Sequence, residues 1–157
     1  MNTSVRTAVA VAAAASAASL VDITEFDVVG ACERGYELEL RNPDGSGTGI
    51  KLSVLGSFAP EVVAHGARLA EQLINEQRVA QRKGKMAKTK TMDELKAQNI
   101  ESAVVRVVGW SGVRQPYTAE LLRAALGRNP HWIPQVIEAA DDLGNFGTTS
   151  ASSFEPT

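Results

Sequence analysis

Strict alternation of apolar and polar residues is the feature that most limits how this chain can fold. In residues 36–41 every second residue is apolar and the others are charged, and a period of two returns in residues 50–54. Because successive side chains of a strand point to opposite faces, each run predicts a strand with one buried face. The segment between them, residues 42–49, is rich in glycine and contains Pro43 and Asp44, which favours a loop. The two runs predict an antiparallel β-hairpin, and residues 23–29 are a candidate for a third, weaker strand.

A hairpin alone is only marginally stable in water, so its apolar face needs helices to pack on. Four segments have apolar residues at the three-to-four spacing of amphipathic helices: residues 60–82, 91–108, 118–126 and a last one that begins at 129–130. In the third of these we expect Leu121, Leu122 and Ala125 to face inward. The sequence therefore predicts an α+β fold, with an N-terminal antiparallel β-hairpin, of two or three strands, packed on a bundle of about four α-helices.

Signals for helix starts accompany all four segments. Pro60 suits a first helical turn, and Ser57 is a candidate cap before it. The residues from Thr91 to Glu94 match a capping box, in which the two side chains bind free backbone N–H groups. The remaining start signals are the candidate caps Thr118 and, followed by a proline, Asn129.

The helices and the hairpin are expected to form a single domain over residues 22–146. Residues 1–21 are rich in alanine, too short and too weakly apolar to cross a membrane, and are interpreted as a flexible leader rather than a signal peptide. Small and polar residues dominate after Gly144, so residues 147–157 are expected to be a disordered tail. No membrane is expected among the partners.

Residue types that commonly carry catalysis are few in this chain. Cys32 is the single cysteine, and His65 and His131 are the only histidines, 66 positions apart and without a ligand-like neighbour at helical spacing. Asp44 is the lone carboxylate of a glycine-rich loop that leads into a strand, which matches neither a calcium loop nor a phosphate-binding loop. The sequence predicts no catalytic residue, no cofactor and no metal, and the protein is expected not to be an enzyme.

Between the first two predicted helices lies a basic run, residues 78–90, without an acidic residue. It contains Arg78, Arg82, Lys83, Lys85, Lys88 and Lys90. Such a run can contact phosphates, but no aromatic residue lies in it for base stacking, and the net charge of the chain is −2. We interpret the basic run as a solvated connection that could make electrostatic contact with an acidic helix of a protein partner. A small nucleic-acid-binding regulator is the alternative.

Short phrases spread over residues 22–146 carry a family resemblance. They are Asp22-Ile23-Thr24-Glu25-Phe26 ahead of residues 36–45, then Asn99-Ile100-Glu101, residues 104–110, residues 134–139 and Leu143-Gly144-Asn145-Phe146. In this order they resemble the tail assembly chaperones of long-tailed, siphovirus-type bacteriophages. The resemblance implies a non-catalytic factor of the host cytoplasm that binds the apolar, helical tape measure protein and presents it to tail tube subunits. It also implies the major tail protein as a partner. Further copies of the chain are a separate candidate partner.

A chaperone of this kind needs apolar helix faces beyond those that its own core uses. The predicted partner-binding residues are Val62, Leu69, Leu73, Val104, Val108, Trp110, Trp132, Ile133 and Ile137. The alternative for most of them is that they bury one another in the core. The alternative function is a structural minor tail or connector protein of the virion.

Overall fold

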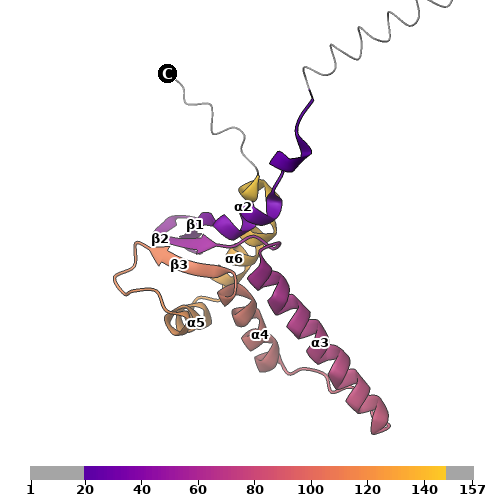
Figure 1. Cartoon of the computed structure of the whole chain (residues 1–157). Coiled ribbons are helices and arrows are strands. Elements are labelled where there is room, and N and C mark those ends of the chain that lie inside the picture. Colours follow the sequence, from indigo (N-terminus) through magenta and orange to yellow (C-terminus); the bar gives the residue numbers. More distant parts are fainter. Residues whose placement is uncertain (1–19, 148–157) are drawn as a thin grey trace, which may run out of the picture.

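The computed structural model describes residues 20–147, which contain a three-stranded antiparallel sheet and five α-helices (Figure 1). The predicted α+β fold is confirmed. Two 3₁₀ turns flank the helices, and the predicted leader and tail lie outside the described residues except for residues 20, 21 and 147. The elements are η1 (Ile23–Glu25), α2 (Val28–Arg34), β1 (Tyr36–Arg41), β2 (Gly47–Val54), α3 (Pro60–Arg82), α4 (Met92–Val104), β3 (Val107–Ser111), α5 (Ala119–Arg128), α6 (Trp132–Asp141) and η2 (Leu143–Phe146).

The predicted hairpin is formed by β1 and β2. Leu38 lies opposite Leu52 in the antiparallel pair, and Leu40, Leu52 and Val54 are buried. Gly45 in the loop has a φ of 87°, a left-handed conformation that glycine adopts without a steric penalty. The alternation in the sequence therefore corresponds to one buried and one solvated face of the sheet.

The third strand is not the one predicted from the sequence. Residues 23–29 form η1 and the start of α2, because the side chain of Asp22 accepts a hydrogen bond from the N–H of Thr24 and that of Asp27 from the N–H of Gly30. These bonds close turns that compete with an extended conformation. The hydrogen bonds from Thr24 also lower the pKa of the Asp22 carboxyl. The prediction of a strand at residues 23–29 was wrong.

The sheet is completed by β3, which the sequence placed largely at the end of a helix. α4 ends at Val104, and the chain then pairs antiparallel with β2, with Trp110 opposite Leu52 and Ser111 opposite Lys51. A short run of valines satisfies both a helical and an extended pattern, so periodicity does not locate the boundary. The prediction that the helix continues to residue 108 was wrong.

Two of the predicted helix caps are confirmed and two are wrong. The capping box is present: the N–H of Glu94 donates to the Thr91 hydroxyl at 3.2 Å, and the N–H of Thr91 donates to the Glu94 carboxylate at 3.1 Å. Thr118 caps α5 in the predicted way. Ser57 does not cap α3, because its hydroxyl donates to the carbonyl of Ala140, 3.0 Å away. Asn129 does not cap α6, because its amide donates to the carbonyl of Ala125 at the end of α5, and α6 begins only at Trp132.

Most buried side chains lie in one core between the sheet and the helices α4, α5 and α6. α6 packs against β1 and β2, while α4 packs against α5 and α6. Leu121 is exposed, contrary to the prediction that it faces inward. The buried residues of this main core are Leu40, Leu52, Val54, Ala103, Val104, Val107, Leu122, Leu126, Val136 and Ala140.

A second, smaller core joins α2, the residues before α3, and η2. Cys32 and Phe146 are buried there together with Val62 at the start of α3. The ring of Tyr36 packs edge-on against that of Phe146, with the ring centroids 6.2 Å apart. This core holds the beginning of α3 against the body of the protein.

Candidate functional site

α3 is much longer than the core requires. It has 23 residues, and Val62 near its beginning is the only buried one. With a rise of 1.5 Å per residue, the helix is roughly 34 Å long. Figure 1 shows it extending away from the sheet, with its far end beyond α4. Most helices in proteins are stabilised by packing of an apolar face, so the uncovered length of α3 needs another explanation.

Apolar side chains remain exposed along this uncovered length. Val63, Leu73, Ile74 and Val79 have exposed fractions between 48% and 54%, and Leu69 is partly buried. Single apolar residues on a surface are common, but at roughly 3.6 residues per turn Val63, Leu73 and Ile74 lie on one side of α3 and form a patch of the kind found at interaction sites. Val79 lies on another side of the helix. α3 therefore carries apolar surface that the described part of the chain does not cover.

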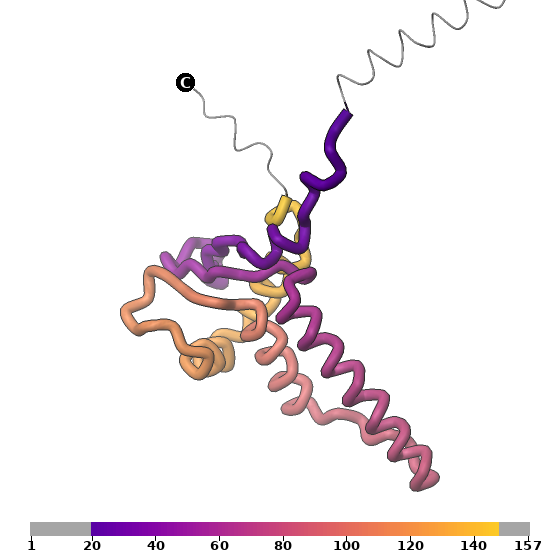
Figure 2. The backbone as a smooth tube through the Cα atoms, in the orientation of Figure 1, coloured from indigo at the N-terminus to yellow at the C-terminus, as the bar shows by residue number. Residues whose placement is uncertain are grey.

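The chain reverses direction after α3 and forms the second wall of a groove. Figure 2 shows it turning at the end of α3 and running back beside that helix before α4 begins. The resulting α3–α4 groove is open and has a volume of about 910 Å³. Its apolar lining residues are Leu69, Val79, Ala80, Met86 and Ala97. The groove adjoins the exposed apolar face of α3, so the two form a continuous candidate site.

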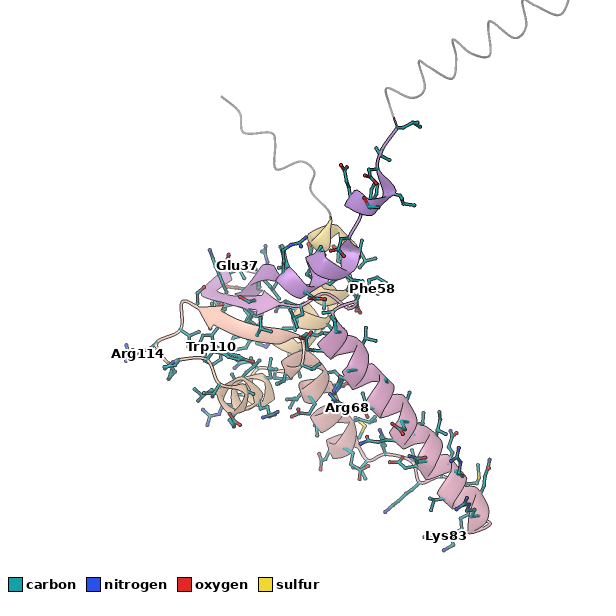
Figure 3. The ribbon with its side chains drawn as sticks, in the orientation of Figure 1. Glu37, Phe58, Arg68, Lys83, Trp110 and Arg114 are labelled. Atoms are coloured by element: carbon teal, nitrogen blue, oxygen red, sulfur yellow. The ribbon has the colours of Figure 1, made fainter. Side chains whose placement is uncertain are left out.

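Positive charge lines this groove on the side of the connecting segment. Four lysines contribute to the lining: Lys83, Lys85, Lys88 and Lys90. Within residues 20–147 none of the four forms an ion pair, and Lys90 donates instead to the amide oxygen of Gln98 at 2.6 Å. Figure 3 shows Lys83 at the far end of α3. We call residues 83–90 the lysine segment.

Three carboxylates also line the groove, but two of them already have partners. The carboxylate of Glu101 pairs with Arg123 of α5, with 2.5 Å between Oε1 and Nε, and this contact raises the pKa of the arginine. The carboxylate of Glu94 accepts the hydrogen bond of the capping box. The capping hydrogen bond does not neutralise Glu94, so Glu76 and Glu94 remain to offset the four lysines locally. The groove therefore combines an apolar lining with an excess of positive charge.

The basic residues of segment 78–90 do not all lie in the groove. The four lysines line the groove, whereas Arg78 and Arg82 lie on α3 outside the lining. Any electrostatic contact made in the groove is therefore a property of the lysine segment.

The predicted partner-binding residues are not brought together in one surface. Val62 and Val104 are buried, and the partly buried Ile133 and Ile137 pack against the main core. These four residues therefore serve the fold, in agreement with the alternative interpretation. Leu69 and Leu73 remain partly or largely accessible on α3, and the exposed Val108 lies away from them on β3.

The two tryptophans line a separate pocket of about 400 Å³ between the sheet and α5. The indole N–H of Trp110 donates to the carbonyl of Gln115 at 2.8 Å, and that of Trp132 donates to the carbonyl of Arg41 at 3.2 Å. Figure 3 shows Trp110 at β3, beside α5. Both tryptophans pack against the main core and take no part in the α3–α4 groove.

Sequence reasoning missed several residues of the candidate site. Val63 and Ile74 belong to a second apolar stripe on α3. Ala70 of this stripe lies seven positions after Val63 and four positions before Ile74. A helix with apolar residues on more than one side has more apolar surface than a single packing face requires, and that signal was available in the sequence. The nearly fully exposed Met86 gave no periodic signal, because it lies in the lysine segment.

The described residues offer little for metal or acid–base chemistry. No group of three or more histidine, cysteine, aspartate or glutamate side chains in residues 20–147 is placed to hold a metal ion. Cys32 is buried and is not part of a disulfide. The Nε2 atoms of His65 and His131 are buried without a hydrogen-bond partner. His65 lies in α3, whereas His131 directly precedes α6. No helix of the described residues is long and apolar enough to cross a membrane.

No protein-family model matches the chain, and neither a curated protein nor a solved structure is significantly similar to it. The exposed face of α3 and the adjoining α3–α4 groove are therefore the structural features on which a function can be proposed.

Proposed function

We propose that this protein is a tail assembly chaperone of a siphovirus-type bacteriophage, which binds the tape measure protein in the host cytoplasm and catalyses no reaction. The observation that carries the proposal is the apolar surface of α3 that the protein's own core leaves uncovered. A chaperone for an apolar helical chain needs such a surface. The resemblance of short phrases in residues 22–146 to this family suggests the identity of the partner.

The size of the exposed surface suits a reversible complex. Burying a whole valine, leucine or isoleucine side chain is worth about 1.5–3 kcal/mol. Val63, Leu73 and Ile74, which share one side of α3, are each about half exposed, so docking gains roughly half of that per residue. Association also costs translational and side-chain freedom, so the net binding is moderate. Moderate binding agrees with a factor that must release its partner when the tail tube assembles.

The proposal is tested by co-expressing the full chain with the tape measure protein of the same phage and purifying the complex. The wild type should retain the tape measure protein in soluble form. The double variant Leu73→Glu/Ile74→Glu should lose it, because two charges would be placed on the apolar face of α3. Failure of the wild type to retain the tape measure protein would contradict the proposal.

The matched control is Arg78→Gln/Arg82→Gln. It changes the net charge by the same amount and lies on the same helix, but it leaves the exposed apolar residues intact. This control should bind like the wild type. If both double variants bind as well as the wild type, another surface makes the contact.

A further inference from the structure

We propose that the α3–α4 groove holds an acidic amphipathic helix of the partner, with its apolar stripe against α3 and its carboxylates against the lysine segment. This proposal rests on the proposed function only for the identity of the partner. The chemistry of the bound segment is argued from the lining of the groove.

The apolar part of the lining indicates that the occupant has an apolar face. Leu69 and Val79 on α3 lie opposite Ala97 of α4, and Met86 of the lysine segment contributes a side chain that is 96% exposed. Methionine is flexible and polarisable, and it is common at surfaces that adapt to helical ligands. Helices bound in such grooves present apolar residues at spacings of three, four and seven.

The charges in the lining indicate the sign of the occupant's other face. Lys83, Lys85 and Lys88 have neither an ion-pair partner nor a side-chain hydrogen bond among the described residues, and Glu76 is the one lining carboxylate that is similarly free. Complementary charge accelerates association and excludes partners of the wrong sign. An acidic helix satisfies these lysines, whereas a basic helix of the same shape is repelled.

The α3 wall of the groove is long enough to hold a helical segment. The α3 wall runs from His65 to Lys83, which at 1.5 Å per residue is roughly 27 Å, or about five helical turns. The lining contains no phenylalanine, tyrosine or tryptophan on which a nucleic-acid base could stack. A polypeptide is therefore favoured over single-stranded nucleic acid as the occupant.

The first test uses two designed helical peptides of about 20 residues with the same leucine stripe. One peptide has glutamate at its polar positions and the other has lysine. Binding of each labelled peptide to the full chain is measured by fluorescence anisotropy at low and at physiological salt. The acidic peptide should bind at least about tenfold more tightly, and added salt should reduce this preference. Equal binding of the two peptides, or preference for the basic one, would overturn the proposal.

The second test locates the binding in the groove. Lys85→Glu/Lys88→Glu should weaken binding of the acidic peptide by at least about tenfold. The matched control, Arg78→Glu/Arg82→Glu, makes the same change in net charge at positions outside the lining and should weaken it by no more than about threefold through long-range effects. Equal losses in the two variants would show that net charge, and not the groove, recruits the peptide.

Two further measurements identify a different occupant. Tighter binding of a labelled single-stranded oligonucleotide than of the acidic peptide, lost in Lys85→Glu/Lys88→Glu alone, would overturn the proposal in favour of nucleic acid. Self-association of the chain in sedimentation experiments, abolished by the same variant and not by its control, would assign the groove to another copy.

The outcomes also separate this inference from the proposed function. If the tape measure protein is retained by Lys85→Glu/Lys88→Glu but lost by Leu73→Glu/Ile74→Glu, the function stands and the groove proposal falls. If the acidic peptide binds in the groove while the tape measure protein is not retained, the groove proposal stands and the partner is a different protein.

Discussion

The leucines of this protein have two kinds of environment. Leu52 and Leu126 are buried in the main core, whereas Leu73 on α3 is about half exposed. Sequence reasoning treated the apolar positions of the helices as equivalent, because periodicity shows which residues share a face but not what that face meets. Substitution of these leucines by alanine should therefore change the free energy of unfolding by different amounts.

We expect Leu126→Ala to lower the free energy of unfolding by about 2–5 kcal/mol, because it leaves a cavity in the main core. Leu73→Ala removes the same atoms from an exposed position and should change it by less than about 0.5 kcal/mol. Urea unfolding followed by circular dichroism measures both. A loss above about 2 kcal/mol for Leu73→Ala would show that α3 is packed more closely than its exposure indicates.

The capping box offers a test of local structure. Thr91→Ala removes the acceptor for the N–H of Glu94 and should cost about 0.5–2 kcal/mol in the same urea experiment. Thr91→Ser keeps a hydroxyl at this position and serves as the control. Similar unfolding of the two variants would mean that the start of α4 does not depend on this bond.

Tyr117 links stability to alkaline pH. Its hydroxyl donates to the carbonyl of Val107 at 2.9 Å, and burial raises the pKa of the phenol. Since the folded pKa lies above the unfolded one, the stabilisation is complete below about pH 10 and is lost as the pH rises through the folded pKa. Tyr117→Phe should cost about 1 kcal/mol at neutral pH and should flatten the loss of stability above pH 10. Tyr36→Phe is the control, and an unchanged alkaline slope in Tyr117→Phe would contradict the assignment.

Among the elements, those determined by neighbouring residues were predictable. The hairpin follows from two alternating runs joined by a short loop, and the starts of α4 and α5 follow from side chains that bind the first helical turn. The boundary between α4 and β3 depends on pairing with β2, which lies far away in the chain. Local patterns carry no information about such a partner, so the predicted helix ran on into the strand.

α3 is expected to open more readily than the rest of the described fold. Its second half, residues 70–82, has no buried residue, whereas β2 and α6 contribute to the main core. Local opening needs little energy where few apolar contacts are broken. Amide hydrogen exchange should therefore be faster in residues 70–82 than in β2 or α6, and a bound partner should slow it. Equal protection of α3 and β2 in the free protein would contradict this expectation.

The whole molecule combines a compact body with one extended helix. The body consists of the sheet, its covering helices and two cores, and α3 leaves it from the smaller core (Figure 1). A chaperone needs a stable body that presents an uncovered surface, and a component that stays in the particle needs that surface to be permanently covered. The proposed function and its alternative therefore differ in where the protein is found after assembly.

The proposed function predicts that purified mature phage particles lack this protein, because an assembly chaperone leaves when tail tube subunits replace it. Quantitative mass spectrometry of intact particles and of assembly intermediates measures its amount relative to the tape measure protein. A fixed, stoichiometric amount in mature particles would favour a minor tail or connector protein instead.

The pattern of residues along the chain was sufficient for the α+β class, the hairpin and the helix that becomes α3. Each depends on interactions between residues a few positions apart, which the sequence displays directly. Contacts between distant segments decide the remaining features. These are the third strand, the burial of Val62 and Val104, the exposure of Leu73 and the α3–α4 groove. The same apolar stripe can be core or binding surface, because burial depends on whether another part of the protein lies against it. The folded arrangement covers the start of α3 and leaves the remainder accessible.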